Sequence, residues 1–162
     1  DAAAFVAAPT WQGQPRETTP YARRLGEPLI ADLAAHYGNG LLPRLAALLV
    51  ELANACLALQ DRLEDWPATA QRAQATDDEA GVGCAEAARG LLVHRVEVAN
   101  DRVVSYRILA PTEWNFHPAG VVAAGLAGIA ETSGADNAEL TRRARLHITA
   151  IDPCVAYRLS VS

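Results

Sequence analysis

Several residue types are absent or scarce in this sequence of 162 residues, and each absence excludes a class of protein. Three cysteines are too few for a domain held together by disulfides. All 14 basic residues are arginines, and 19 acidic residues outweigh them, so a basic face for nucleic acid is not expected. No unbroken apolar run reaches the roughly 18–20 residues that span a bilayer, so no membrane span is predicted. Methionine is missing even at the first position, and we expect a C-terminal piece of a longer protein.

The residues that are present predict one folded domain over 1–162, because 51% are hydrophobic and 20% are charged. Proline and glycine interrupt residues 1–20, which we expect to form an irregular lead-in. Residues 21–66 have a helical pattern that is broken at Gly38, Asn39 and Gly40. After the break, apolar residues recur at steps of three or four and predict a long amphipathic helix that packs its stripe into the core: Leu42, Leu45, Leu49, Leu52, Cys56, Leu59 and Leu63.

The second half of the chain has a different period. Residues 67–83 are polar, acidic and end in glycine, so we expect a connector there. Residues 84–117 are predicted to form a β-hairpin and a turn, with strands at 91–98 and 103–109. Residues 118–162 are predicted to hold two C-terminal helices, at 120–130 and from Asp136 to about Ile151, followed by the Asp-Pro-Cys tail. The predicted fold class is α+β, mainly helical, with long helices and a β-hairpin.

Complete catalytic or metal motifs are not found in the sequence. The four histidines, His36, His94, His117 and His147, show no spacing that places two metal ligands on one helix face. The sequence contains no zinc-protease helix, no phosphate-binding loop and no nucleophile elbow. The residues alone therefore assemble no complete active site.

Four short segments nevertheless carry unusual residue combinations, and each has a plain structural interpretation. Arg16-Glu17 with Arg23-Arg24 is typical of a solvated face. Arg89, in the segment Glu86-Ala87-Ala88-Arg89-Gly90, could be a loop arginine paired with Glu86 or Glu79. The segment from Pro111 to Pro118 favours a packed turn around Trp114. Cys154, in Asp152-Pro153-Cys154, could be a small buried apolar residue.

In this order, and together with Gly81-Val82-Gly83 and His94, the four segments resemble the C-terminal half of the large subunit of NiFe hydrogenases. That family has a Gly-x-Gly stretch before Glu-Ala-Pro-Arg-Gly, then a hairpin, a Pro-Thr-x-Trp-Asn segment and a closing Asp-Pro-Cys-x-x-Cys-x-x-His. The matching residues here are Arg89-Gly90, Pro111-Thr112, Trp114-Asn115 and Asp152-Pro153-Cys154. The resemblance covers nearly the whole chain.

Two departures change what the resemblance implies. Tyr157 stands at the position of the second cysteine, and the closing histidine is absent. One cysteine cannot hold nickel in a four-thiolate site. The pattern is therefore similar to the HupK/HoxV-like hydrogenase maturation proteins, which are large-subunit paralogues. It implies a cytoplasmic, non-catalytic scaffold that assembles or transfers the Fe(CN)2CO group with other maturation proteins or the large-subunit precursor.

The resemblance also implies roles for individual residues. A metal-bound cyanide accepts hydrogen bonds at nitrogen, so Arg89 and Thr112 would donate to the two cyanides. Pro111 and Leu92 would line the apolar side near carbon monoxide. Cys154 would bind iron transiently in the full-length protein, whereas no nickel, and no metal in this isolated chain, is expected.

Alternative interpretations stay open at this point. The chain could be a fragment of a catalytic large subunit, or a metal-free module that docks maturation partners through its long helix. Cys56 is expected to pack in the core because it lies on the apolar stripe. Cys84 could reach the same site as Arg89, and His94 is expected to be a hydrogen-bonding structural residue.

Overall fold

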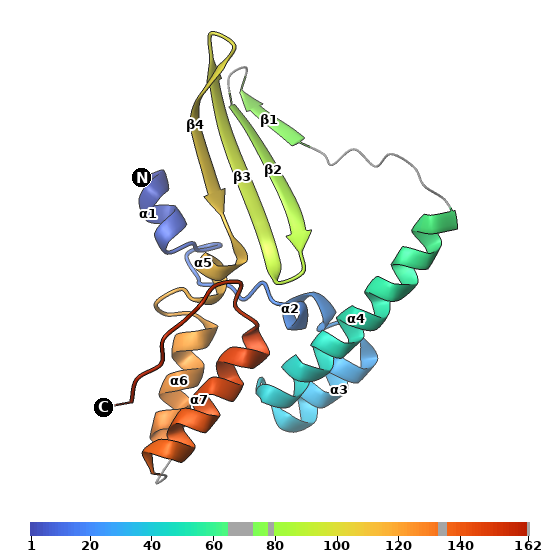
Figure 1. The fold of residues 1–162 in the computed structure, drawn as a ribbon, viewed down its shortest axis with the longest axis vertical. Helices are drawn as coiled ribbons and strands as arrows, with labels where there is room; N and C mark the ends of the chain where they lie inside the picture. Colours follow the sequence, from blue (N-terminus) through green and yellow to red (C-terminus); the bar gives the residue numbers. More distant parts are fainter. Residues whose placement is uncertain (65–72, 78–79, 133–135, 162) are drawn as a thin grey trace.

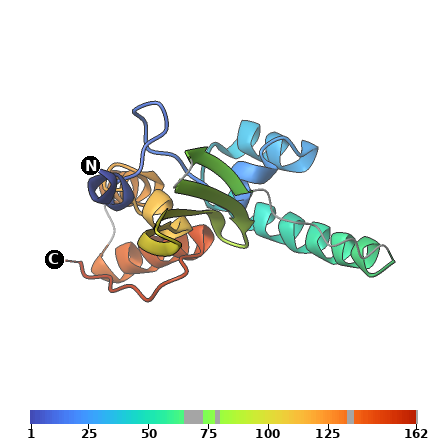
Figure 2. The same ribbon diagram turned by 90° about the horizontal axis from the view of Figure 1, so that it is seen from above.

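The computed structural model describes residues 1–64, 73–77, 80–132 and 136–161. Figure 1 shows a twisted sheet at one end of the molecule and most of the helices at the other, and Figure 2 shows the same arrangement from above. The strands are β1 (Ala73–Asp77), β2 (Ala80–Ala87), β3 (Gly90–Ala99) and β4 (Arg102–Leu109). The helices are α1 (Ala2–Ala7), α2 (Pro20–Arg24), α3 (Pro28–Tyr37), α4 (Leu41–Glu64), α5 (Pro111–Asn115), α6 (Val121–Thr132) and α7 (Asn137–Ile151). The fold is α+β.

The sheet is larger than the hairpin that the sequence predicts. It is antiparallel, with strand order β1-β2-β3-β4. The predicted hairpin is present as β3 and β4, and Asn100 and Asp101 form its turn with φ of 51° and 57°. The sequence predicts a connector at 67–83, and this prediction is wrong from residue 73 onward, because β1 and the start of β2 lie there. Residues 65–72 and 78–79 lie outside the described residues. Glycines at 81 and 83 weaken the strand signal, but pairing with Val96 and His94 satisfies their backbone groups.

The first 20 residues are not irregular throughout. Asp1 accepts a hydrogen bond from the Ala3 backbone N–H at 2.9 Å and so caps α1. The chain then runs without a helix until α2, with an isolated bridge between Trp11 and Gln14. Figure 1 shows α1 beside β4. This placement brings Phe5 edge-on to Trp114, with ring centroids 6.3 Å apart.

The longer helices follow the predicted boundaries closely, whereas the break between α2 and α3 and the short helix α5 were not predicted. Gly38 has φ of 70° and ends α3, as the predicted break requires. Asp136 accepts a hydrogen bond from the Glu139 N–H at 2.9 Å and opens α7. Two separate clusters form the core: Tyr21, Ile30 and Ala47 between α2, α3 and α4, and Val122, Ile148 and Ile151 between α6 and α7.

The apolar stripe of α4 does not lie in the core, which corrects the sequence prediction. All seven stripe residues, from Leu42 to Leu63, are exposed, and this includes Cys56. By length and composition alone, Leu41–Leu63 could cross a membrane. The sequence prediction of no membrane span was based on unbroken apolar runs. It did not include Leu41–Leu63, because the charged residues Arg44 and Glu51 interrupt that segment.

Candidate functional site

The turn that carries Arg89 is pressed against two other segments of the chain. Gly90 is buried and has φ of 139°, a conformation that other residues rarely adopt. A Cβ atom at this position would collide with the Thr18 hydroxyl and lie 3.1 Å from Pro111 Cβ. This close approach places the Arg89-Gly90 turn directly against the start of α5. The same start of α5 carries Pro111 and Thr112, which the sequence predicts to be site residues.

Asn115 joins the same three segments by hydrogen bonds. Its side chain is buried, and its Oδ1 accepts from the Thr18 backbone N–H at 2.8 Å. Its Nδ2 donates to the Arg89 carbonyl at 3.3 Å. Sequence reasoning quoted Asn115 within a motif but gave it no role. The buried amide of Asn115 thus links two segments, since one of them supplies its donor and the other its acceptor. The hydrophobic periodicity of a sequence does not reveal a contact of this kind.

Trp114 is buried, as predicted, with 5% of its surface exposed. A buried indole N–H usually has a hydrogen-bond partner, but Nε1 of Trp114 has none among the described residues. Glu113 instead orders the start of α5, since its Oε2 accepts from the Ala110 N–H at 2.8 Å. Trp114 is therefore held by packing, including the edge-on contact with Phe5, rather than by a polar contact.

The C-terminal segment reaches the same place through Asp152. Arg89 Nε lies 3.0 Å from Asp152 Oδ2, in a charge contact that is not aligned as a hydrogen bond. Asp152 has φ of 53° and ends α7 in a left-handed turn. This contact brings the Asp-Pro-Cys segment to the Arg89 turn, and Cys154 follows two residues later with its side chain exposed.

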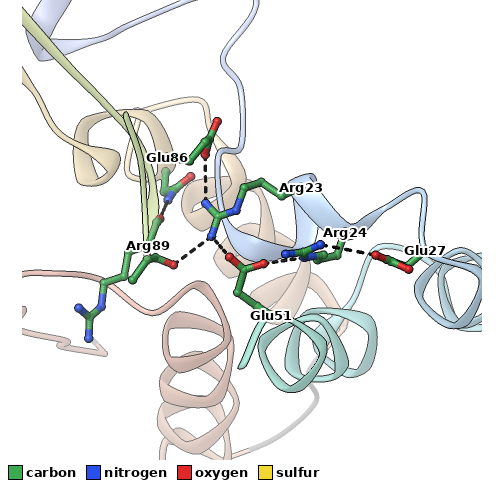
Figure 3. A network of polar contacts seen from close by, with 8 residues as sticks. Arg23, Arg24, Glu27, Glu51, Glu86 and Arg89 are labelled. Atoms are coloured by element: carbon green, nitrogen blue, oxygen red, sulfur yellow. Dashed lines mark hydrogen bonds and ion pairs between the residues drawn. The ribbon is translucent and has the colours of Figure 1, made fainter. Parts of the chain in front are cut away.

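A separate cluster of charges, shown in Figure 3, tests the interpretation that Arg89 is a loop arginine paired with Glu86 or Glu79. Arg23 binds Glu51 at 2.8 Å, Glu86 at 3.3 Å and the Ala88 carbonyl at 3.1 Å, and the Arg89 side chain points away from this cluster. Glu86 therefore pairs with Arg23 rather than with Arg89, and Glu79 lies outside the described residues. The prediction that Arg23 is a solvated residue is wrong.

Arg24 belongs to this cluster too, so the solvated interpretation is wrong for it as well. Its Nε donates to Glu51 Oε2 at 2.6 Å. Partial burial alone would raise the pKa of Glu51, but the hydrogen bonds from Arg24 and Arg23 outweigh this effect and hold that pKa below its ordinary value. The cluster fixes α2 and α4 to the turn between β2 and β3.

The neighbouring residues Arg16 and Glu17 lie in different environments. Arg16 is exposed, whereas Glu17 forms an ion pair with Arg44, whose side chain is 2% exposed. Arg44 Nη2 donates to Glu17 Oε2 at 2.7 Å, and the guanidinium lies 5.0 Å from the centre of the Tyr21 ring. Glu17 therefore fixes the segment that leads through Thr18 into α2.

The remaining predicted residues lie around this junction. Pro111 is buried, Thr112 and Leu92 are half-buried, and Cys84 is exposed on β2. That the Cys154 thiol and the Thr112 hydroxyl face the same space as the Arg89 guanidinium remains a prediction. Within the described residues, no group of three or more His, Cys, Asp or Glu side chains is placed to hold a metal ion.

Two histidines have structural partners. His94 contacts the Tyr106 hydroxyl across the β3–β4 pair, as expected for a structural residue. His147 Nε2 donates to the Val121 carbonyl at 3.1 Å. Burial lowers the pKa of His147, although the bond to Val121 opposes that shift.

Comparison with known proteins identifies relatives over nearly the whole chain. A family model described as nickel-dependent hydrogenase matches residues 42–158. The hydrogenase expression/formation protein HupK of Rhizobium leguminosarum bv. viciae is 36% identical over 99% of this chain and 42% of its own length. The hydrogenase expression/formation protein HoxV of Cupriavidus necator is 39% identical over 94% of this chain and 40% of its own length. The chain thus spans about two fifths of these relatives.

Solved structures share the fold. The Ni-Fe-Se hydrogenase from D. vulgaris Hildenborough superposes with a TM-score of 0.66 at 23% identity, over 91% of this chain and 36% of that chain. An NAD+-reducing NiFe hydrogenase in the H2-reduced state gives a TM-score of 0.60 at 22% identity, over 85% of this chain and 34% of that chain.

Proposed function

The chain belongs to the nickel-dependent hydrogenase family, and on that premise we propose that it is the large-subunit-like part of a hydrogenase maturation protein. In this role it corresponds to the C-terminal half of a large subunit and has no hydrogenase activity. Its cargo is the Fe(CN)2CO group, which it holds during assembly or transfer to the large-subunit precursor. Two similar proteins, from R. leguminosarum and C. necator, carry the name hydrogenase expression/formation protein.

The contact between Arg89 and Asp152 is the observation that carries the proposal. These residues are 63 positions apart in the sequence, and their side chains approach to 3.0 Å. Arg89 is the residue expected to bind cyanide, and Asp152 begins the segment that contains the thiol of Cys154. Because the two segments meet at this point, a small cargo could be recognised by both.

The residues present suit a cargo with cyanide ligands. The Arg89 side chain is 43% exposed and contacts Asp152 through Nε, so its two terminal nitrogens can act as donors toward anionic cyanide nitrogen. Thr112, one residue after buried Pro111, supplies a hydroxyl donor. Pro111 and Leu92 supply the apolar surface that suits carbon monoxide. Cys154 is exposed, so its sulfur is accessible to an incoming iron group.

The same residues do not suit nickel. A soft four-ligand nickel site needs several thiolates, and Tyr157 replaces the second cysteine of the closing motif. A phenol is a harder donor than a thiolate and does not replace a bridging thiolate. This substitution supports a role in holding iron rather than in hydrogen chemistry.

Metal analysis of the whole protein, purified without oxygen, tests the proposal. We expect iron together with infrared bands of bound cyanide and carbon monoxide, and we expect Cys154→Ser to lose both. Cys56→Ser is the matched control, because Cys56 lies on α4 and takes part in none of the contacts of this junction. Stoichiometric nickel would show a catalytic subunit instead, and a protein without metal would favour an interaction module.

A second measurement follows the cargo in cells. Serine is nearly isosteric with cysteine but offers no anionic soft donor at neutral pH. Cys154→Ser should therefore reduce hydrogenase activity while the level of soluble protein stays the same. Full activity at the wild-type protein level would contradict the role of Cys154 in holding iron.

A further inference from the structure

One face of α4 is apolar and has no cover within the described part of the chain. The exposed fractions of its leucines are high, for example 69% for Leu49, 62% for Leu52 and 69% for Leu63. Cys56 lies in the same stripe and is also exposed. Burial of an apolar side chain normally stabilises a folded protein or a complex, so a continuous row of exposed leucines indicates a binding surface.

The opposite face of α4 attaches the helix to the molecule. Arg44 and Ala47 are buried there, and Glu51 is held by Arg23 and Arg24. At 100° per residue, the centre of the stripe lies about a third of a turn away from these residues, so the stripe faces outward. Figure 1 shows the second half of α4 extending away from the other elements.

The second half of α4 cannot be stable on its own in water. From residue 55 to residue 63 every side chain is exposed. An isolated helix of this length is marginal even for strong helix formers, and most helical stability comes from packing. Another surface must therefore cover this segment in the working protein.

A polypeptide suits this surface better than a membrane does. Arg44 and Glu51 lie within the apolar stretch Leu41–Leu63 and are ion-paired to α2 and to the segment before it. Insertion into a bilayer would break these pairs or carry the charges into hydrocarbon, which is costly. The stripe itself is a row of leucines at helical spacing, and such a row fits the apolar face of another helix.

We propose that the leucine stripe of α4 is covered, in the whole protein, by the polypeptide that makes up the rest of the family's length. The relatives HupK and HoxV carry about three fifths of their length outside the region matched here. The hydrogenase structures likewise place about two thirds of their chains outside it. The covering segment would be a helix with an apolar face. This inference does not depend on the proposed binding of iron.

Thiol labelling of the whole protein tests the proposal at two neighbouring positions. Cys56 lies in the stripe, and Ala58 lies on the opposite face two residues later; both are exposed in this structure. Trypsin cuts after Arg44 and Arg62, so both positions fall in one peptide. The rate of N-ethylmaleimide labelling of Cys56 is compared with that of the thiol introduced by Ala58→Cys in a Cys56→Ser background.

We expect Cys56 to react about tenfold more slowly than the introduced thiol, because labelling then requires local opening of the cover. The wild-type protein and the double variant are checked for folding by circular dichroism before labelling. Equal rates in the folded proteins would overturn the proposal. Protection that disappears on dilution would show a second copy instead, and protection that needs added lipid vesicles would show a membrane surface; either result would also overturn it. Loss of iron binding with Cys56 still protected would contradict the proposed function alone.

Discussion

Replacing Glu17 by glutamine should strongly destabilise the protein, because it removes the partner of a buried charge. Arg44 is 2% exposed and donates to Glu17 at 3.0 and 2.7 Å. Its other hydrogen bonds are to the carbonyls of Asn39 and Gly40, which carry no charge. Removing one partner of a buried ion pair typically costs about 3–5 kcal/mol of the free energy of unfolding. For a chain of this size, that corresponds to a fall in Tm of roughly 6–20 °C.

Urea denaturation of the whole protein, followed by tryptophan fluorescence, measures this loss. Glu27→Gln is the matched control, because Glu27 makes a partly exposed ion pair with Arg24 at 3.5 Å. The control should lose less than about 1 kcal/mol. Combining Glu17→Gln with Arg44→Met should recover stability, because the unpaired charge is then gone. Equal small losses in Glu17→Gln and Glu27→Gln would refute the reasoning.

Three further predictions follow from the same structure. Trp114→Ala should cost about 3–5 kcal/mol in urea denaturation, whereas Trp114→Phe should cost less because the indole N–H has no partner to lose. Gly90→Ala should cost about 3 kcal/mol or more from strain and collision, whereas Gly83→Ala, with open space around it, should have little effect in the same assay. The pKa of His147 is lowered in the folded state, so the unfolded state takes up its proton first and stability should decline as pH falls through about 6.5. Unfolding at several pH values should show this decline in the wild type but not in His147→Gln.

The helices could be predicted because their signals are local. The break at Gly38 requires a positive φ that glycine adopts easily, and Asp136 caps α7 with its own side chain. The hairpin of β3 and β4 was also predictable, since Asn100 and Asp101 tolerate the left-handed turn between two β-branched runs.

The strand β2 could not be predicted from its own residues. Gly81 and Gly83 favour a loop by composition, and they form a strand because β3 supplies their hydrogen-bond partners. The stripe of α4 shows the reverse case. Its pattern correctly predicts an apolar face, but the pattern alone does not say which part of the protein covers it.

The candidate site is held together by contacts that need no metal, so a fold of this kind could lose its nickel without losing the arrangement of the site. Asn115 links Thr18 to the Arg89 turn through neutral hydrogen bonds, and Arg89 meets Asp152 in a partly exposed charge contact. The position of Tyr157 takes part in none of these contacts. Exchanging a cysteine for tyrosine there would remove a nickel ligand without loosening the junction, because none of these contacts depends on that residue. A large-subunit fold could thus lose nickel binding and keep the donors for cyanide, and this supports the proposal that the chain holds an iron group rather than catalysing hydrogen chemistry.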